Sequence, residues 1–390
     1  MKSRVWFLVI VFFGILVLLP AGTKAADDIK IGLVTPLSAP GDYEAGKINV
    51  QTVELAVEQL NQKGGILGRK VVLVKADDEG KPAVGATAVQ RVIANDKVSA
   101  IVGAWHGSVA VAQAKIADKM GVPIFFHYSW PDDLTTMHSN YVFRISPYNS
   151  QIANLLVPFL VQKGFKNVAV MHETTAYGTG FAEALAKAGK AKGINVILKG
   201  FPSEAQDLKP QLLELKAMKT KADLLVVSSV YQAMYLIPKQ AYEVGLAPDT
   251  KILAGWDYPG WSPEWWEVMG EKGVGVMYPT FDSPKLKLMS LGEQFKKAFP
   301  EKYKYDPPIY AYFLYDEVMI IADAMTRAKS SDPKKLAEAL KATRFNGTTG
   351  VVTFERKDGP VWNQWTGHQL FVLQLTALKQ AGKDAAIIYP

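Results

Sequence analysis

Cysteine is absent from the 390 residues of this chain. Its absence excludes disulfide bridges, thiolate metal sites, cysteine nucleophiles and an amino-terminal lipidated cysteine. The motifs G-x-x-x-x-G-K-S/T, G-x-G-x-x-G after a strand, H-E-x-x-H and G-x-S-x-G are missing too. The five histidines include no i,i+4 pair that would form a metal-binding helix face. The sequence gives no support to an enzyme, and we expect no metal and no cofactor.

Long apolar runs are also scarce, and the one that occurs lies near the amino terminus. Lys2 and Arg4 precede the run Val5–Leu19, and small residues follow as far as Ala25. As a helix, this run would span about 22 Å, which is short of the ~30 Å hydrocarbon core of a membrane. The pattern therefore predicts a cleaved secretory signal peptide over residues 1–25 rather than a membrane anchor, and an exported mature protein.

The positive charge is modest and dispersed. The formal net charge of +7 falls to +4 when the three basic residues of the expected signal peptide are removed. The remaining lysines are scattered singly, and no basic run is interleaved with aromatic residues. We therefore expect no nucleic-acid partner.

Short apolar runs alternate with windows of helical spacing from residue 29 onward. Near-continuous apolar strands separated by helices are typical of a parallel sheet that is covered on both faces. The pattern restarts near residue 150, which predicts two doubly wound α/β units in tandem. The expected strands of the first unit are Ile29–Val34, Val71–Lys75, Ala100–Val102 and Pro123–Phe126, and those of the second are Val168–Met171, Val196–Leu198, Leu224–Val227 and Ile252–Ala254.

The last third of the chain is too short for a third α/β unit, so we expect it to complete the first two. The chain would then cross three times between two lobes, and the crossings together would act as a hinge. The expected crossings are Arg144–Pro147, Tyr278–Ser283 and Gly350–Gly359, with residues 26–146 plus 281–355 in lobe 1 and residues 147–280 plus 356–390 in lobe 2.

Aromatic residues follow five of the expected strands, in both units. In open parallel sheets, ligands bind beyond the carboxyl ends of the strands, so these residues would line a cleft. The loop 103–108 also precedes a helix, whose first N–H groups and positive dipole end suit a carboxylate. Asp257 is the acidic residue opposite this anion site. The candidate ligand-binding residues are Trp105, His106, Gly107, Ser108, Tyr128, Ser129, Trp130, Tyr177, Tyr231, Trp256 and Asp257.

Each of these residues also has a plainer interpretation, and so do two other motifs. Trp105 alone would fit lobe packing, and Ser108 alone would fit a helix cap. The run Asp77-Asp78-Glu79 is interpreted as solvated. The segment Tyr177–Gly180 lacks the third glycine of a phosphate loop, so we interpret it as a turn that enters a helix. The prediction of a cleft rests on the fact that the candidate residues all follow strand ends, not on any one of them.

The chain resembles the periplasmic ligand-binding proteins of the leucine/isoleucine/valine-binding type, which serve ABC importers. The resemblance covers nearly all of the mature chain, and its order and spacing are specific. It implies two α/β lobes joined by three crossovers, the type I periplasmic binding protein fold. The segments that carry it are Ile31–Ser38, Gly64–Val71, Asp77-Asp78, Ala117–Pro123, Tyr141–Arg144, Tyr177–Gly180 and Phe345–Gly350.

The resemblance also implies roles for some site residues. The loop Gly103–Ser108 falls where the family holds the ligand carboxylate, Tyr177 matches a ring from the second lobe, and Asp257 falls where an acid accepts the ligand's ammonium group. Tyr231 lies at, or one residue beyond, a further family tyrosine. The sequence departs from the family pattern in the segment 127–130, where bulky rings replace small side chains.

We therefore expect a periplasmic solute-binding component of an ABC importer that binds its ligand by hinge closure. The expected ligand is an amino acid or an amino-acid-like compound, with an aromatic carboxylate or a small amide as the alternative. The expected partner is a membrane permease, and the protein is expected to be a monomer. A ligand-sensing receptor module and a secreted hydrolase are the alternatives from other classes. The hydrolase would require a nucleophile–base pair in the cleft.

Overall fold

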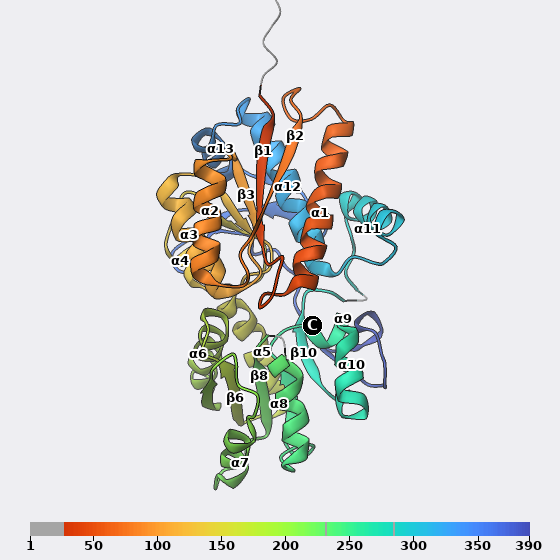
Figure 1. The fold of residues 1–390 in the computed structure, drawn as a ribbon. Helices are drawn as coiled ribbons and strands as arrows, with labels where there is room; N and C mark the ends of the chain where they lie inside the picture. Colours follow the sequence, from red (N-terminus) through yellow and green to blue (C-terminus); the bar gives the residue numbers. More distant parts are fainter. Residues whose placement is uncertain (1–26, 231, 284) are drawn as a thin grey trace, which may run out of the picture.

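The computed structural model describes residues 27–390 except residues 231 and 284, so the expected signal peptide and Tyr231 lie outside the described residues. Two seven-stranded sheets form the centres of two lobes, which are stacked along the long axis of the molecule (Figure 1). Among the described residues, no helix combines the length and apolar character needed to cross a membrane. The expectation of two doubly wound, mainly parallel sheets is confirmed.

The first lobe contains the sheet with strand order β13-β14-β5-β4-β3-β1-β2. Helices cover both of its faces (Figure 1). Its strands are β1 (Ile29–Thr35), β2 (Val71–Asp77), β3 (Ala100–Gly103), β4 (Ile124–Phe126), β5 (Val142–Arg144), β13 (Glu355–Arg356) and β14 (Trp362–Gln364), and its helices are α1 (Tyr43–Gln62), α2 (Pro82–Ala94), α3 (Gly107–Met120), α4 (Asp133–Thr136), α11 (Ser290–Tyr303), α12 (Ile309–Ala328) and α13 (Pro333–Lys341).

The second lobe contains the sheet with strand order β16-β15-β10-β9-β8-β6-β7. A separate two-stranded sheet pairs β11 (Arg344–Asn346) with β12 (Val351–Thr353). The strands of the second lobe are β6 (Asn167–Glu173), β7 (Asn195–Phe201), β8 (Leu224–Ser228), β9 (Lys251–Ala254), β10 (Met277–Thr280), β15 (Phe371–Gln374) and β16 (Ala386–Tyr389), and its helices are α5 (Asn149–Lys163), α6 (Ala176–Lys190), α7 (Lys209–Ala217), α8 (Gln232–Glu243), α9 (Tyr258–Trp261) and α10 (Pro263–Met269).

The central strands are apolar on both sides because helices cover both faces of each sheet. In β1, Ile31, Leu33 and Val34 have no exposed surface, and β8 is buried along its whole length. β1 pairs in parallel with β2 and with β3, so the carboxyl ends of these three strands reach the same edge of the sheet. The corresponding edge of the second sheet collects the ends of β6, β8 and β9 in the same way.

The expected third crossing, Gly350–Gly359, and the lobe boundary after residue 355 are wrong. Strand β14 pairs in parallel with β5 through Gln364 and Arg144, and β13 pairs with β14, so both strands belong to the first sheet. The chain leaves this sheet only after Gln364. These strands have two and three residues and few apolar side chains, so the sequence gives no strand signal there.

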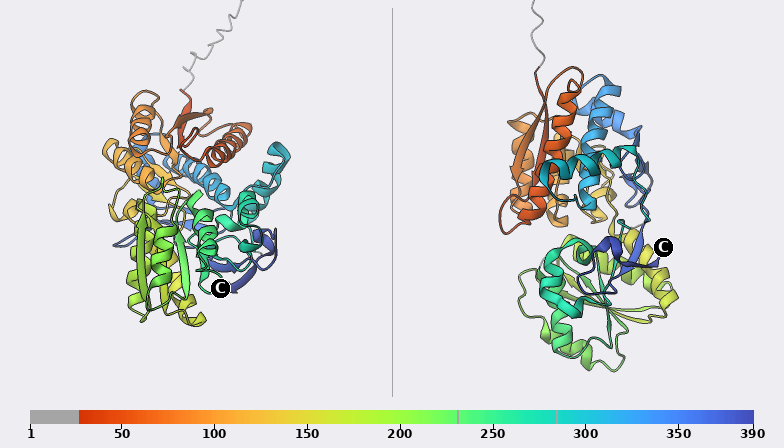
Figure 2. Two further views of the ribbon diagram at one scale, coloured as in Figure 1. Left: turned by 60° about the horizontal axis from the view of Figure 1, so that its bottom comes forward. Right: turned by 90° about the vertical axis from the view of Figure 1, so that its right-hand side faces the viewer.

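The three segments that connect the lobes contact one another. Gln364 donates a hydrogen bond from Nε2 to the carbonyl oxygen of Ser146 at 2.8 Å, and His368 Nε2 lies 2.6 Å from the carbonyl oxygen of Ile145. The ring of Phe281, on the second connection, lies 6.4 Å from the ring of His368. The right-hand view of Figure 2 shows the connecting segments passing between the two lobes, so a hinge motion would be centred on this group of contacts.

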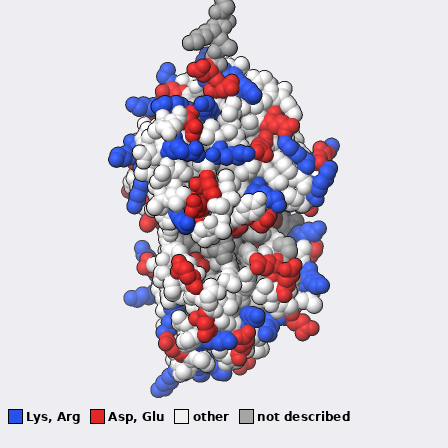
Figure 3. Space-filling view, viewed as in Figure 1, with Lys and Arg blue, Asp and Glu red and all other residues white. Residues whose placement is uncertain are grey.

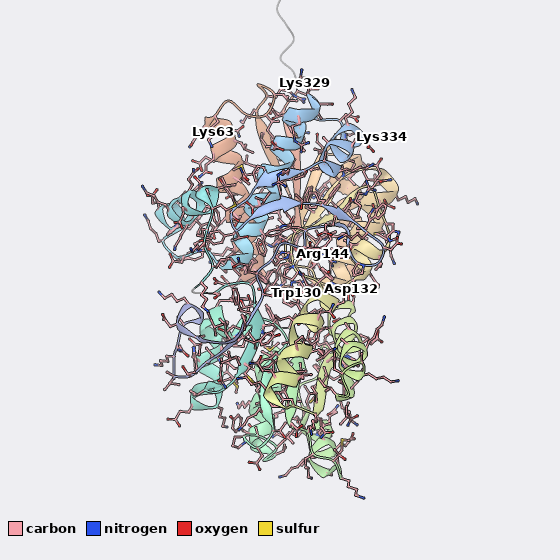
Figure 4. All side chains as sticks on the ribbon, turned by 180° about the vertical axis from the view of Figure 1, so that it is seen from behind. Lys63, Trp130, Asp132, Arg144, Lys329 and Lys334 are labelled. Atoms are coloured by element: carbon pink, nitrogen blue, oxygen red, sulfur yellow. The ribbon has the colours of Figure 1, made fainter. Side chains whose placement is uncertain are left out.

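Arg144 is the main polar contact that holds β14 in the first sheet. It is fully buried, and it donates hydrogen bonds from Nε to Gln364, from Nη1 to the carbonyl oxygen of Pro131 at 2.6 Å, and from Nη2 to Thr135 at 2.9 Å. Burial lowers its pKa to about 10, so it stays charged near neutral pH. Figure 4 places Arg144 in the first lobe, just above Trp130 and Asp132 at the junction of the lobes.

Replacing Arg144 with methionine should lower the free energy of unfolding by about 3–5 kcal/mol, because several buried acceptors lose their donor. Urea denaturation measures this loss. The exposed Arg91→Met variant is the control and should change the free energy by less than about 0.5 kcal/mol. Equal effects of the two substitutions would contradict the role given to Arg144.

Candidate functional site

A cavity of about 640 Å³ lies between the two lobes, at the carboxyl ends of strands from both sheets. The volume lies within the range of about 300–1,000 Å³ that is typical of small-molecule sites. Acidic and basic side chains are interspersed over the face that Figure 3 shows. The first lobe contributes Pro40, Gly80, Lys81, Pro82, Trp105, His106, Gly107, Ser108, Val109, Tyr128 and Trp130 to the cavity wall, and the second contributes Glu173, Thr175, Tyr177, Ser203, Glu204, Ala205, Val230, Gln232, Ala233 and Trp256.

The aromatic residues expected at the strand ends pack together in this wall. Trp105 stacks on Tyr128 with ring centroids 4.7 Å apart and an interplanar angle of 13°. Trp256, from the second lobe, meets these two rings edge-on at 6.4 and 6.1 Å. Trp130 and Tyr177 form another edge contact between the lobes at 5.9 Å. Five of the expected ring residues therefore form one apolar surface that joins both lobes.

Tyr310 extends this surface from α12, and the sequence analysis missed it. Its ring lies 4.8 Å from Trp105 and 5.3 Å from Tyr128, and it is fully buried. Tyr310 lies near the start of a long apolar helix, where a single aromatic residue gives no signal of a site.

The loop after β3 places His106, Gly107 and Ser108 in the cavity wall, as expected. His106 is the residue before the first turn of α3, and burial lowers its pKa to about 4, so its imidazole is neutral near pH 7. Ser108 is not the helix cap; its Oγ accepts a hydrogen bond from the backbone N–H of Ala176, at the start of α6, at 3.1 Å. Ser108 therefore connects the two lobes.

Ser129 does not line the cavity. Its hydroxyl is buried and lies 3.1 Å from the carbonyl oxygen of Ala104 and 3.3 Å from that of Trp105, both of which accept from it. Ser129 therefore ties together the loops that follow β3 and β4, and it supports Trp105 from behind.

Asp257 lies behind the cavity wall rather than in it. One oxygen of its carboxylate accepts hydrogen bonds from the hydroxyl of Tyr128, across the gap between the lobes, and from Trp261 Nε1 at 3.3 Å. The other accepts from Thr280 Oγ1 at 3.2 Å. Burial raises the pKa of Asp257 to about 6. In this arrangement three protein donors occupy the carboxylate that the resemblance assigns to the ligand's ammonium group.

Glu173 is an acidic residue in the wall that the sequence analysis passed over. It is the last residue of β6 and is 2% exposed. Its Oε1 accepts hydrogen bonds from Ser229 Oγ at 2.5 Å and from the backbone N–H of Val230 at 3.1 Å. Burial raises its pKa, and the nearby Glu204 raises it further. Its position at the carboxyl end of an apolar strand is the signal that could have identified it.

The turn from β6 into α6 explains the Tyr177–Gly180 motif. Thr175 caps α6, accepting a hydrogen bond from the N–H of Gly178 at 3.0 Å. A side chain at position 178 would lie 2.3 Å from the carbonyl oxygen of Glu173, so only glycine allows this approach. The motif is therefore a helix entry, as expected, and it places Tyr177 next to Glu173.

The expectation of a solvated Asp77–Glu79 run is wrong for its central residue. Asp78 is fully buried, accepts hydrogen bonds from the N–H of Gly80 and from Gln113, and has its pKa raised by burial to about 6. The tight turn after β2 directs it inward under α3. Among the described residues, no group of three or more metal-ligating side chains is assembled here or elsewhere.

A family described as "Periplasmic binding protein" matches residues 28–381. The chain belongs to this family. A Leu/Ile/Val-binding protein homolog of Brucella abortus is 29% identical over 350 residues, which cover 83% of this chain and 84% of that protein. The resemblance to the leucine/isoleucine/valine-binding type is thereby confirmed.

Solved structures share the two-lobed type I fold of this periplasmic binding protein. The leucine-binding protein LivK of Thermotoga maritima has a TM-score of 0.80 and 27% identity, covering 93% of this chain and 99% of that one. A solute-binding protein of Rhodopseudomonas palustris in complex with 3,4-dihydroxybenzoic acid has a TM-score of 0.76 and 20% identity, covering 94% and 99%. The relatives are binding proteins by name, which supports a solute-binding role rather than an enzyme.

The buried carboxyl of Asp257 predicts a specific pH dependence of stability. Its pKa in the folded chain is about 6, above the ordinary value of 3.8, so folding favours the protonated form. The contribution of this group to stability is complete below pH 4 and is lost as the pH rises through 6. Relative to the wild type, Asp257→Asn should therefore gain up to roughly 3 kcal/mol between pH 4 and pH 7.

Urea denaturation of both proteins at several pH values, without ligand, tests this difference. The amide oxygen of asparagine can still accept from Tyr128 and Trp261, so the comparison isolates the titration. Parallel stability curves for the two proteins would show that Asp257 does not titrate in this way.

Proposed function

We propose that the protein is the periplasmic solute-binding component of an ABC importer and that it holds its ligand in the cavity between the lobes. The observation that carries the proposal is a cavity whose wall is built in nearly equal parts from two lobes. A ligand that contacts both walls stabilises the closed arrangement and shifts the equilibrium between open and closed forms. A membrane permease would recognise the closed form, and the protein would act as a monomer.

Contacts between the lobes support the closure step. The Ser108–Ala176 and Tyr128–Asp257 hydrogen bonds and the Trp130–Tyr177 ring contact all join the first lobe to the second. Each contact joins residues of different lobes, so opening of the lobes would separate the pairs. The same opening would give a ligand access to the aromatic surface.

We rank an amino acid or an amino-acid-like compound first as the ligand. The family membership and the leucine-binding relative support this class. An aromatic carboxylate or a small amide is the second candidate, because rings dominate the wall where the family pattern has small side chains, and aromatic faces suit stacking. The relative that binds a dihydroxybenzoic acid has the same fold.

A thermal-shift screen of residues 26–390 against amino acids, aromatic acids and small amides tests the proposal. A ligand at about 100 times its dissociation constant adds roughly 2.7 kcal/mol of stability, a readable rise in melting temperature. Replacing Trp105 with leucine should weaken binding of any hit at least about tenfold, because a ring of the binding surface is lost.

The control for this prediction is Trp362→Leu. Trp362 packs on His138 and Arg356, away from the cavity. Calorimetry on both variants gives the affinities. If Trp105→Leu binds as tightly as Trp362→Leu, the cavity is not the binding site, whatever ligand the screen finds.

A further inference from the structure

The charges in the cavity wall are unevenly divided between the lobes. The charged residues of the wall are Lys81 in the first lobe and Glu173 and Glu204 in the second, while His106 is neutral near pH 7. Lys81 forms an ion pair with Glu79 at 2.8 Å on its own side of the gap. The second lobe therefore presents uncompensated negative charge to the cavity.

Glu173 is the buried part of that charge, and it lacks a cationic partner within the described chain. None of the ion pairs among the described residues includes it. The neighbouring charge that acts on it is the like charge of Glu204. A buried carboxylate is costly unless a positive group or several donors compensate it. Ser229 and Val230 both donate to Oε1, and the hydroxyl of Ser203, another residue of the wall, also stabilises the carboxylate. All three are neutral donors, so no positive charge among the described residues balances Glu173.

We propose that Glu173, rather than Asp257, receives the cationic group of the ligand, and that the ligand is therefore a compound with a protonated amine and an apolar body. This inference rests on the proposed solute-binding function and narrows its ligand class. Glu173 lies in the wall with one oxygen fixed by Ser229 and Val230, whereas Asp257 lies behind the wall with both oxygens bonded to protein donors.

The rings beside Glu173 favour the same kind of ligand. Burial is the main cause that raises the pKa of the Tyr177 phenol, and the nearby carboxylate of Glu173 raises it further. An ammonium group bound to Glu173 would therefore also lie near an aromatic ring, which attracts cations. The stacked rings of Trp105 and Tyr128, with Trp256, would contact the apolar body of the ligand.

Two matched sets of three compounds separate the chemical groups. Phenylalanine, phenethylamine and 3-phenylpropionate share one body, and leucine, isoamylamine and 4-methylpentanoate share another. Within each set, one compound has both ends, one has only the amine and one has only the carboxylate. We expect the compounds with an amine to bind the wild type, and the compound without it to bind at least about tenfold more weakly.

The variants Glu173→Gln and Asp257→Asn then locate the cation. Glutamine keeps an oxygen that can accept from Ser229 and Val230, so Glu173→Gln should fold, and its melting curve checks this. Calorimetry should show amine binding weakened at least roughly 30-fold in Glu173→Gln, as for the loss of one partner of a buried charge pair. The exposed Glu214→Gln, in the same lobe, is the control and should bind like the wild type.

Each other result overturns the inference in a distinguishable way. If the carboxylates without an amine bind as tightly as the amines, or if Asp257→Asn rather than Glu173→Gln abolishes amine binding, Glu173 is not the cation site and the solute-binding function stands. If no compound of either set binds the wild type, the ligand class of the proposed function fails, and the inference fails with it.

Discussion

The site depends on one constraint, which is that the parallel strands of both sheets end at the same gap. Parallel pairing brings the carboxyl ends of β1 and β3 to one edge of the first sheet, and those of β6, β8 and β9 to the facing edge of the second. The residues that follow these strands must then lie together. Trp105 and Trp256 are in contact, for example, although 150 residues lie between them in the chain. The cavity is a consequence of strand direction.

That constraint explains what the sequence could predict. Apolar strands separated by helices identify the fold, and the residue after each strand end is then placed near the gap, which is why Trp105, Tyr128 and Trp256 were found. Strands β13 and β14 were not predicted because they contain no apolar run. They form because β14 pairs with the edge strand β5, and Arg144 holds it there through Gln364. Asp78 was misjudged because only the turn after β2 determines that it faces inward.

The two acids show a different limit of sequence reasoning. Glu173 and Asp257 both stand at strand ends in the second lobe, so position alone gives them equal access to the cavity. What separates them is competition for their oxygens: Tyr128, Trp261 and Thr280 all donate to Asp257, and these donors come from three separate segments of the chain. Sequence spacing does not reveal that these three donors lie around one carboxylate. An acid at a position that matches the family's ammonium-binding acid therefore does not have to play that role.

Asp257 and Glu173 differ in which groups offset the cost of burying their carboxylates, and this difference affects how closure would depend on the ligand. In the structure, Asp257 accepts the hydroxyl of Tyr128 from the opposite lobe, so the protein itself compensates part of the burial of that carboxylate. The donors to Glu173, which include Ser229 and Val230, come from its own lobe, and no cation of the other lobe pairs with it among the described residues. In the proposed closure, Glu173 would be removed from water without such compensation, which would favour the open form. If the ligand carries a positive group, as we propose, it would remove this cost, and Glu173 would make closure depend on the ligand.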